Sequence, residues 1–498
     1  MVRGAILGML VFIAVSSCPS QSLSRIDRER GHVMLRFLRQ DLVDYYYDPG
    51  FHGVDLAARF SDADKKIDRA ATLGQMFLAI GGALFDLRDA HTQFIPPPRT
   101  LRVDYGWEMA MIGDSCYVTA VSPGSDAAAK GLRAGDRICS IDGCVPSRSS
   151  MHVLRTTMED LDPRAVVSMR FQCPDGGMND LQIGTRRRER VRVVNSAAPS
   201  AGERTVDDAI PEGPAPAAGV PHLKLIGDSL AVWKLPRFDL SAKETGRVME
   251  TIGGSRALVL DLRNNPGGYI TSLLALAGYF FDEDVTLFRA KGRTGVDSVV
   301  AHTSGRPYRG KVIVLIDSRS GSSSEIFARA MQFYGRGVVI GDVSCGSVME
   351  AMYRQHAVGA DNVVMYEANI TVAAIALPDG RPLEGRGVVP DEIILPAPRD
   401  IALGLDPVMV RATECAGAPP DGWRAGELFP AARGAGNPLV SSELPSAGKK
   451  IHDGGHRNNR GARRSVTHTP ADLPYFSPRF FFSINTCAST GAEQRGHT

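Results

Sequence analysis

The sequence predicts a multidomain α/β protein that has a helical N-terminal region and a β-rich insert ahead of its α/β core. Length is the first reason, because 498 residues exceed one ordinary hydrophobic core and suggest about three domains. Patterning is the second, since apolar residues recur at helical spacing over residues 25–100 and short alternating segments fill residues 103–194. Strand-like and helix-like segments then alternate over residues 222–396, which is typical of an α/β domain with buried central strands.

The N-terminal residues 1–18 have the pattern of a secretory signal. Arg3 is followed by an apolar run from Ala5 to Val15 and then by small residues. This run is too short to span a bilayer as a lasting helix, which disfavours a retained membrane anchor. The letters VSSC also resemble the lipobox of bacterial lipoproteins, so simple cleavage and lipid attachment at Cys18 both stay open. Either interpretation predicts an exported protein, periplasmic or membrane-anchored through the lipid.

The bulk composition limits the partners and cofactors to be expected. A formal net charge of +2 gives no reason to expect nucleic acid as a partner. The cysteines beyond Cys18 show no C-x-x-C or similar metal-ligand spacing, so we expect neither a metal nor an organic cofactor. An exported location would permit disulfides, although structural or free thiols are the default interpretation.

The first domain is predicted to be helical over residues 25–100. Apolar residues follow helical spacing in HVMLRFLRQDLVDYYY and in ATLGQMFLAIGGALFDL, and the letters DPGFHG between them indicate a turn. IPPPR, at Ile95–Arg99, ends this region because consecutive prolines cannot continue a helix.

The β-rich unit, residues 103–194, resembles a PDZ domain. CYVTAV and VVSMRF alternate as strands do, and VSPGSDAAAKGLRAGDRICSIDG is similar to the PDZ core. The resemblance implies that an extended chain adds to a sheet edge and that backbone amides capture its terminal carboxylate. The corresponding loop here is YGWEM, which departs from the usual Gly-Leu-Gly-Phe type, and its candidate substrate-binding residues are Gly106, Trp107, Glu108 and Met109. A small structural β-domain is the alternative.

Two segments of biased composition flank the α/β core. Residues 195–221 are rich in Ala, Pro and Gly without periodicity, which indicates a linker. Residues 397–498 form a C-terminal extension, and we expect disorder from about residue 430 because its Gly, Ser, Arg and His cannot bury enough apolar surface.

Two strand-to-helix turns in the core carry residues suited to acyl transfer. ALVLDLRNNPGG, at Ala257–Gly268, is a buried strand followed by a glycine-rich turn whose backbone amides can point at a developing oxyanion. SRSGSSSEIF, at Ser318–Phe327, places serines at the positive end of a helix dipole. Plain N-capping is the alternative role for any one of these serines.

Together with GRGVVPD, the order of these motifs resembles the carboxy-terminal processing, or tail-specific, proteases and their tricorn-like relatives. The resemblance covers roughly residues 25–396 and extends to YYYDPGFHG and LRDAHTQFIPP. It implies a ClpP/crotonase-like α/β protease core with Ser322 as the nucleophile. It also implies that the oxyanion donors are the amide of Ser323 and that of Gly267 or Gly268.

The chain departs from the family at the general base. Most members use a lysine followed four residues later by a glutamine, whereas this chain has Ser347 and Ala351 at those positions. In the tricorn-like branch a histidine from an earlier part of the chain serves as the base and a later glutamate orients it. His91 and Glu384 match those positions, so a Ser322–His91–Glu384 triad follows as a hypothesis.

Several alternatives remain at this point. His91 can instead be a structural residue, and His356 is a second candidate base. The predicted function is an exported serine endopeptidase that forms an acyl-enzyme on Ser322 and cleaves unfolded or C-terminally exposed protein substrates. A catalytically inactive binding or scaffold protein that uses the PDZ-like unit is the alternative, favoured by the loss of the lysine and glutamine. An esterase ranks last because the Gly-x-Ser-x-Gly elbow is missing.

Overall fold

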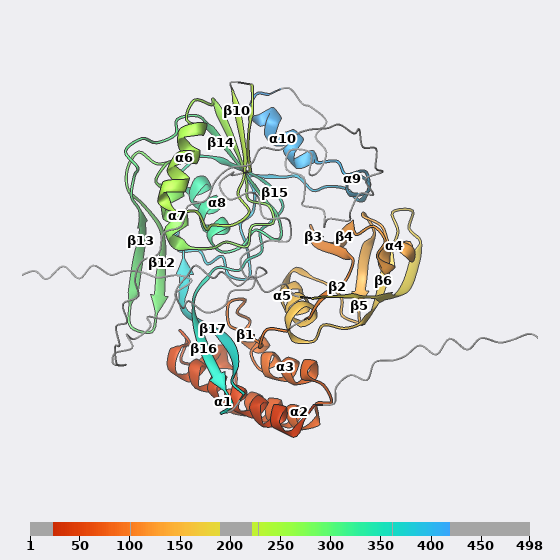
Figure 1. Cartoon of the computed structure of the whole chain (residues 1–498). Coiled ribbons are helices and arrows are strands. Elements are labelled where there is room, and N and C mark those ends of the chain that lie inside the picture. The colour runs from red at the N-terminus through yellow and green to blue at the C-terminus, as the bar shows by residue number, and fades with distance from the viewer. Residues whose placement is uncertain (1–22, 100, 190–221, 228, 361, 419–498) are drawn as a thin grey trace, which may run out of the picture.

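The computed structural model describes residues 23–99, 101–189, 222–227, 229–360 and 362–418 (Figure 1). The predicted signal sequence with Cys18, the linker and the extension beyond residue 418 lie outside the described residues. The fold class is confirmed: an α/β core, a β-rich domain and a helical N-terminal region occupy three different parts of the molecule.

The α/β core is built on a six-stranded sheet whose strands are parallel except for one edge strand. The order is β18 (Glu392–Ile393), β15 (Val338–Gly341), β14 (Lys311–Ile316), β11 (Ala257–Asp261), β10 (Leu230–Lys234) and the antiparallel β9 (His222–Ile226). Helices α6 (Ala242–Ile252), α7 (Ile270–Ala277) and α8 (Ser323–Phe333) share one apolar cluster with one face, and α10 (Pro407–Cys415) packs on the other. Every residue of β11 is buried, which explains its continuous apolar run.

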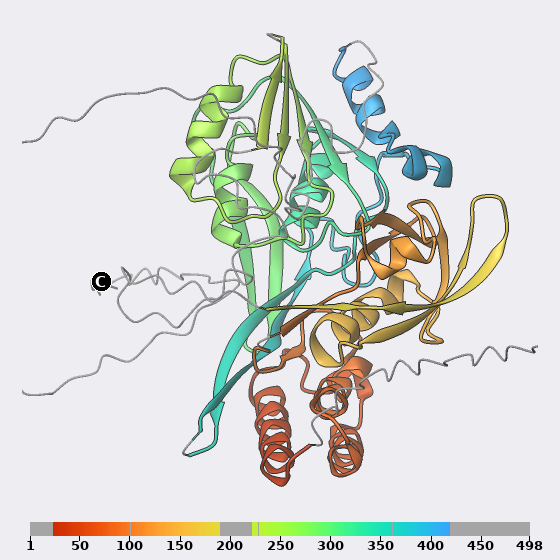
Figure 2. The ribbon, with the colours of Figure 1, turned by 45° about the vertical axis from the view of Figure 1, so that its right-hand side comes forward.

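A second sheet connects the core to the N-terminal region. It contains β1 (Gln93–Ile95), β17 (Val364–Ala376), β12 (Val285–Gly292) and β13 (Val296–Ala301), with β16 (Met349–Val358) paired to β17. The β16–β17 hairpin extends from the core and packs against α1 (Arg25–Tyr45), which lies with α2 (Leu56–Arg69) and α3 (Leu73–Gly82) (Figure 2). Short 3-10 helices at Phe51–Gly53 and Phe85–Leu87 complete this region.

The β-rich domain is one five-stranded antiparallel sheet with two helices. Its strands, in sheet order, are β3 (Trp107–Ile112), β4 (Ser115–Val121), β5 (Arg137–Ile141), β6 (Val166–Gln172) and β7 (Met178–Gly184). The helices are α4 (Asp126–Ala129) and α5 (Arg148–Thr156), and a π-helical turn over Thr157–Leu161 follows α5. A separate ribbon pairs β2 (Leu101–Asp104) with β8 (Arg186–Glu189). Strand β3 therefore lies at an edge of the five-stranded sheet.

This β-rich domain is tied to the core near the end of β15. On α5, Arg148 donates to Asp342 Oδ1 at 2.7 Å, to the carbonyl of Val343 at 2.9 Å and to that of Gly113 at 3.0 Å. Asp342 Oδ2 accepts from the amide of Gly113 at 2.9 Å. The β3–β4 turn and α5 are thus both fixed to the chain that follows β15.

The C-terminal extension begins with two helices, which precede the part for which disorder was predicted. Helix α9 (Pro398–Leu403) contacts the β-rich domain, because a Cβ built on Gly135 would lie 3.2 Å from the side chain of Ala402. Helix α10 then returns to the core sheet.

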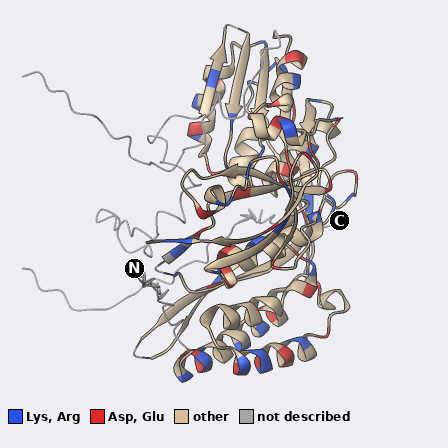
Figure 3. Cartoon of the chain, turned by 90° about the vertical axis from the view of Figure 1, so that its right-hand side faces the viewer, with Lys and Arg blue, Asp and Glu red and all other residues tan. Residues whose placement is uncertain are grey.

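Among the described residues, no helix has the length and apolar character needed to cross a membrane. In the same ranges the six cysteines are free thiols, and no cluster of three or more His, Cys, Asp or Glu side chains is arranged to hold a metal ion. Acidic and basic side chains are interspersed along the N-terminal helices (Figure 3).

Candidate active site

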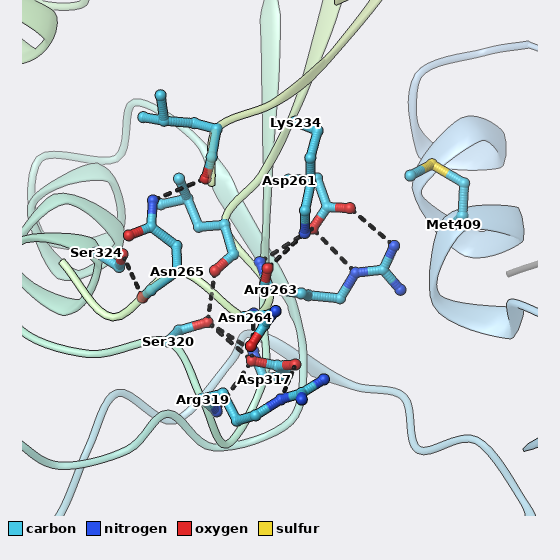
Figure 4. A network of polar contacts seen from close by, with 12 residues as sticks. Lys234, Asp261, Arg263, Asn264, Asn265, Asp317, Arg319, Ser320, Ser324 and Met409 are labelled. Atoms are coloured by element: carbon cyan, nitrogen blue, oxygen red, sulfur yellow. Dashed lines mark hydrogen bonds and ion pairs between the residues drawn. The ribbon is translucent and has the colours of Figure 1, made fainter. Parts of the chain in front are cut away.

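Four serine hydroxyls around Ser322 are engaged with backbone carbonyls. Ser318 donates to Met111 at 2.6 Å, Ser320 to Leu262 at 2.8 Å, Ser323 to Gly268 at 3.2 Å and Ser324 to Asn265 at 2.9 Å. None of these four bonds caps α8. The hydroxyls instead attach the turn to neighbouring chain segments, as Figure 4 shows for Ser320 and Ser324. Within the described ranges the hydroxyl of Ser322 donates to no carbonyl or side chain.

Ser322 lies in a strained backbone conformation at the start of α8. Its φ of 52° and ψ of −116° cost a non-glycine residue on the order of 1–3 kcal/mol. Two acceptors hold its amide: the carbonyl of Ser347 at 2.9 Å and Oε2 of Glu325 at 3.0 Å. A sharp strand-to-helix turn of this kind leaves the Ser322 hydroxyl available for chemistry.

The glycine-rich turn after β11 lies directly beside Ser322. A Cβ built on Gly267 would lie 2.7 Å from Ser322 Cβ and 3.0 Å from the amide nitrogen of Ser323. The Gly267 amide itself donates to Asn265 Oδ1 at 2.8 Å. The amides of Gly268 and Ser323 have no acceptor in the part of the chain that the structure describes. Of the two candidate glycines, Gly268 is therefore the one with an unused donor.

His91 lies in the loop before β1. Ser347 connects its ring to the turn that carries Ser322. Its Nδ1 is 3.4 Å from Ser347 Oγ, and its amide donates to Asp89 Oδ1 at 2.9 Å. Burial lowers the pKa of the His91 imidazole, while the Asp89 carboxylate raises it and His152 of α5 lowers it. No hydrogen bond joins His91 to Ser322 within the described residues, so the two groups are neighbours through Ser347 rather than direct partners.

Glu384 binds main chain on either side of the site rather than the imidazole. It accepts from the amide of Ala90 at 3.2 Å and from that of Val348 at 2.6 Å. Burial raises the pKa of this carboxyl group to about 7. Glu384 thus fixes the loop that carries His91 to the segment that carries Ser347.

His356 lies on the part of β16 that packs against α1. Its Nε2 is 2.6 Å from Asp41 Oδ2, and its ring stacks on Phe37 and on Tyr366. It is nine positions after Ser347, and seven of those steps run along the extended strand β16 from Met349, which corresponds to about 23 Å along the strand. In this fold His356 secures α1 and does not face Ser322.

Glu325 is a site residue that sequence reasoning did not single out. It is fully buried and accepts from Ser344 Oγ at 2.5 Å and from the amides of Gly346, Ser347 and Ser322 at 2.7, 2.9 and 3.0 Å. Burial raises its pKa to about 7, and the four donors lower it. The Ser-x-x-Glu spacing of a capping box was a signal that could have pointed to it.

The four candidate substrate-binding residues lie at the start of the edge strand β3. Trp107 and Met109 pack into the β-rich domain's own core, whereas Glu108 is exposed. The amide of Gly106 donates to Asp104 Oδ1 at 2.9 Å. A ligand would thus meet the outer edge of β3 and not these two apolar side chains.

A buried polar network joins the strand ends beneath the site. Arg263 pairs with Asp261 (Figure 4) and also with Asp406, the N-cap residue of α10, with N–O distances of 2.8–3.0 Å. Lys234 is 3.2 Å from Asp261 and also bonds the carbonyl of Arg263. Because its ammonium is engaged there, Lys234 does not supply the lysine that is missing at position 347.

Two family models match the chain. The model described as "Peptidase family S41" matches residues 229–394, and the model described as "PDZ domain" matches residues 102–161. The first includes both strand-to-helix turns of the site, and the second includes β3 and α5.

Curated relatives carry protease names. A "Carboxyl-terminal-processing protease" of Picosynechococcus sp. is 25% identical over 349 residues, which are 67% of this chain and 76% of the relative. A "Tail-specific protease" of Haemophilus influenzae is 26% identical over 280 residues, which are 52% of this chain but only 36% of that protein. Among solved structures, mature CPAF in complex with lactacystin aligns with a TM-score of 0.55 at 14% identity, covering 76% of this chain and 95% of the other. At that identity the structural likeness concerns the fold alone.

Proposed function

We propose that this chain, which matches the model "Peptidase family S41" over residues 229–394 and the model "PDZ domain" over residues 102–161, is an exported serine endopeptidase that forms an acyl-enzyme on Ser322. The proposed substrates are unfolded or C-terminally exposed proteins. The observation that carries the proposal is the Ser322 hydroxyl: it donates to no acceptor among the described residues, while the four serine hydroxyls around it all donate to carbonyls.

In the proposed mechanism His91 acts as general base and then as general acid. It takes the proton of Ser322 Oγ as this oxygen attacks the scissile carbonyl, and it returns the proton to the leaving amine. Water then attacks the ester, again losing a proton to His91, and the product acid leaves with Ser322 regenerated. The lowered pKa supports this role, because the imidazole is neutral at pH 7 and can accept a proton. The Ser322–His91 hydrogen bond would form on substrate binding, as catalytic contacts often do.

The amides of Ser323 and Gly268 are the proposed oxyanion donors. Both are unpaired in the described part of the chain, and Ser323 lies at the positive end of the α8 dipole. Glu384 is the proposed carboxylate of the triad, acting on the main chain at Ala90 rather than on the ring.

Substrate delivery is proposed to use the free edge of β3, beginning at Gly106. An extended C-terminal segment would add to this edge as a further strand. Support comes from the contact between Ser318 Oγ and the carbonyl of Met111, which places the inner end of β3 against the turn that carries Ser322.

Labelling by a fluorophosphonate probe tests the nucleophile. Wild-type protein should be labelled, and Ser322→Ala should lose both labelling and cleavage of an unfolded protein by roughly 10⁴-fold or more. Ser298→Ala is the control, because this serine is exposed on the edge strand β13 and the variant should retain labelling. Equal labelling of wild type and Ser322→Ala would overturn the assignment.

Cleavage by His91→Ala tests the base. The variant should lose cleavage to a similar extent, whereas His356→Ala should retain it because that ring bonds Asp41. Unchanged cleavage in His91→Ala would rule out the proposed triad.

Export and lipid attachment need separate tests. Deleting residues 1–18 should leave the protein in the cytoplasm of an expressing bacterium, as measured by fractionation. Incorporation of labelled palmitate that disappears in Cys18→Ala would identify the lipoprotein form, and its absence in the wild type would leave simple cleavage.

A further inference from the structure

Ser347 occupies a central place between the nucleophile and the base. Its carbonyl accepts from the amide of Ser322 at 2.9 Å, and its amide donates to Oε2 of Glu325 at 2.9 Å. Its hydroxyl is 3.4 Å from His91 Nδ1 and is the one side chain hydrogen-bonded to that ring among the described residues. Thus the main chain of Ser347 is hydrogen-bonded to the turn that carries Ser322, and its side chain is hydrogen-bonded to His91.

A histidine base needs a defined tautomer. Neutral imidazole has one protonated nitrogen and one lone pair, and an acceptor at Nδ1 keeps the proton there and leaves Nε2 basic. In the Ser-His-Asp triad this acceptor is a carboxylate, and loss of its charge costs about 10⁴-fold in kcat through the wrong tautomer. Here no carboxylate is hydrogen-bonded to the His91 ring within the described ranges.

We propose that Ser347 is the positioning residue for His91. Its hydroxyl accepts a hydrogen bond from the Nδ1–H group of His91. The lone pair of the ring then lies on Nε2, which takes the proton from Ser322. This inference rests on the proposed function, because it assigns a role only if His91 is the base. It also gives a physical account of position 347: the serine that replaces the missing lysine supports a base supplied from elsewhere in the chain.

Other charged groups near the ring modulate the base but do not replace this contact. Asp89 and His152 act on His91 electrostatically. Asp89 uses its oxygens on the His91 amide and on Thr92 Oγ1, at 2.9 and 2.7 Å. Glu384 is engaged with two amides. The Ser347 hydroxyl is a neutral acceptor, so it orients the ring without stabilising the imidazolium as strongly as a carboxylate would.

A substitution series at position 347 tests the role kinetically. Ser347→Ala should lower kcat about 10- to 100-fold with KM nearly unchanged, because ring orientation and not substrate binding is lost. Ser347→Thr keeps the hydroxyl and should restore most of the rate. Equal kcat in wild type and Ser347→Ala, or failure of the threonine variant when both are folded by circular dichroism, would overturn the proposal.

Nitrogen NMR of ¹⁵N-histidine-labelled protein gives a readout that does not depend on activity. In the Ser322→Ala background the His91 ring, identified by its loss in His91→Ala, should show a protonated Nδ1 that becomes mixed in Ser347→Ala. Ser347→Asp should raise the pKa of His91 measured by the same titration. An unprotonated Nδ1 in the protein that retains Ser347 would overturn the proposed role of Ser347, even if the fluorophosphonate labels Ser322 in the wild type. A protonated Nδ1 combined with no fluorophosphonate labelling of the wild-type protein would instead overturn the proposed function.

Discussion

At the scale of single residues, the site depends on a buried carboxylate that has no cation among its hydrogen-bond partners. Glu325 receives hydrogen bonds from three amides and one hydroxyl, and these donors belong both to the nucleophile turn and to the segment of Ser347. Since the amide of Ser322 is one of them, Glu325 helps to hold the strained backbone of the nucleophile. We therefore regard Glu325 as a positioning residue for Ser322.

Replacing Glu325 by glutamine should damage the turn without removing a reacting group. A glutamine side chain has one acceptor oxygen, so its NH₂ group must face donors that the carboxylate had satisfied. We expect kcat to fall about 10- to 100-fold with little change in KM, and the free energy of unfolding to fall by about 1–3 kcal/mol. Steady-state kinetics and urea unfolding measure these changes.

Glu244→Gln is the matched control for that variant. Glu244 occupies the same capping-box position at the start of α6 but is exposed. Comparable losses in both variants would show that Glu325 contributes only an ordinary helix cap.

The pH dependence of kcat/KM should contain two acid ionisations. Burial raises the pKa of Glu325 to about 7, and burial lowers that of His91 below its ordinary value of about 6.5. Both groups work in their deprotonated form, so activity should fall as pH decreases first through 7 and then below 6.5. The carboxyl group of Glu384, whose pKa burial also raises to about 7, contributes to the step near 7. In Glu325→Gln that step should therefore become smaller, and it should disappear in the double variant Glu325→Gln, Glu384→Gln while the lower step remains. An unchanged step near pH 7 in Glu325→Gln would contradict the assignment of Glu325.

At the scale of elements, the two strand-to-helix turns interlock. The amide of Gly321 donates to the carbonyl of Asn265 at 2.9 Å, and Ser320 and Ser324 bind carbonyls of the same segment. Gly267, with a φ of 105°, brings its Cα close enough to Ser322 that a side chain has no space. The proposed nucleophile and the proposed oxyanion donors are therefore positioned as one unit.

Gly267→Ala should disrupt that unit. The new methyl group would lie 2.7 Å from Ser322 Cβ in a backbone conformation that L-residues avoid. We expect kcat to fall by about 100-fold or more, with a matching decrease in the rate of fluorophosphonate labelling. We also expect the melting temperature measured by calorimetry to decrease. Gly295→Ala is the control, since nothing lies within 4 Å of its Cβ position and its φ is ordinary. Full activity in Gly267→Ala would show that the turns are not coupled.

At the scale of the whole molecule, the PDZ domain is fixed to the core by a small number of polar contacts. Arg148 and Asp342 provide most of them, and the segment that starts at Asp342 continues to Ser347. His152 lies one helical turn after Arg148 on α5 and acts electrostatically on His91. The position of the PDZ domain is thus connected to the site through the segment from Asp342 to Ser347, through the Ser318–Met111 hydrogen bond and through His152.

Arg148→Ala should separate delivery of large substrates from the chemistry. Loss of the three Arg148 bonds should raise KM for an unfolded protein roughly 10-fold, while hydrolysis of a small ester stays near the wild-type rate. Arg170→Ala is the control, because Arg170 pairs only with Asp180 on the exposed face of the same domain. Parallel losses on both substrates would mean that the contact supports the active site itself.

Much of the fold and part of the site could be predicted from sequence because their signals are local. Apolar periodicity predicted the helical, β-rich and α/β parts, and the ordered motifs pointed to Ser322. The other serines could not be assigned locally: their hydroxyls bind Met111, Leu262, Gly268 and Asn265, and these acceptors are remote in sequence.

The sequence by itself predicted a tail-specific type of protease with a PDZ-like unit and no lysine at position 347. Only the tertiary structure decided which groups meet. Strand β1 pairs with β17 in the register Gln93↔Asn369, and this pairing carries His91 to within 3.4 Å of Ser347. The same sheet places His356 against α1. Distances between side chains depend on strand register across hundreds of residues, whereas a motif reports only on its own turn of chain.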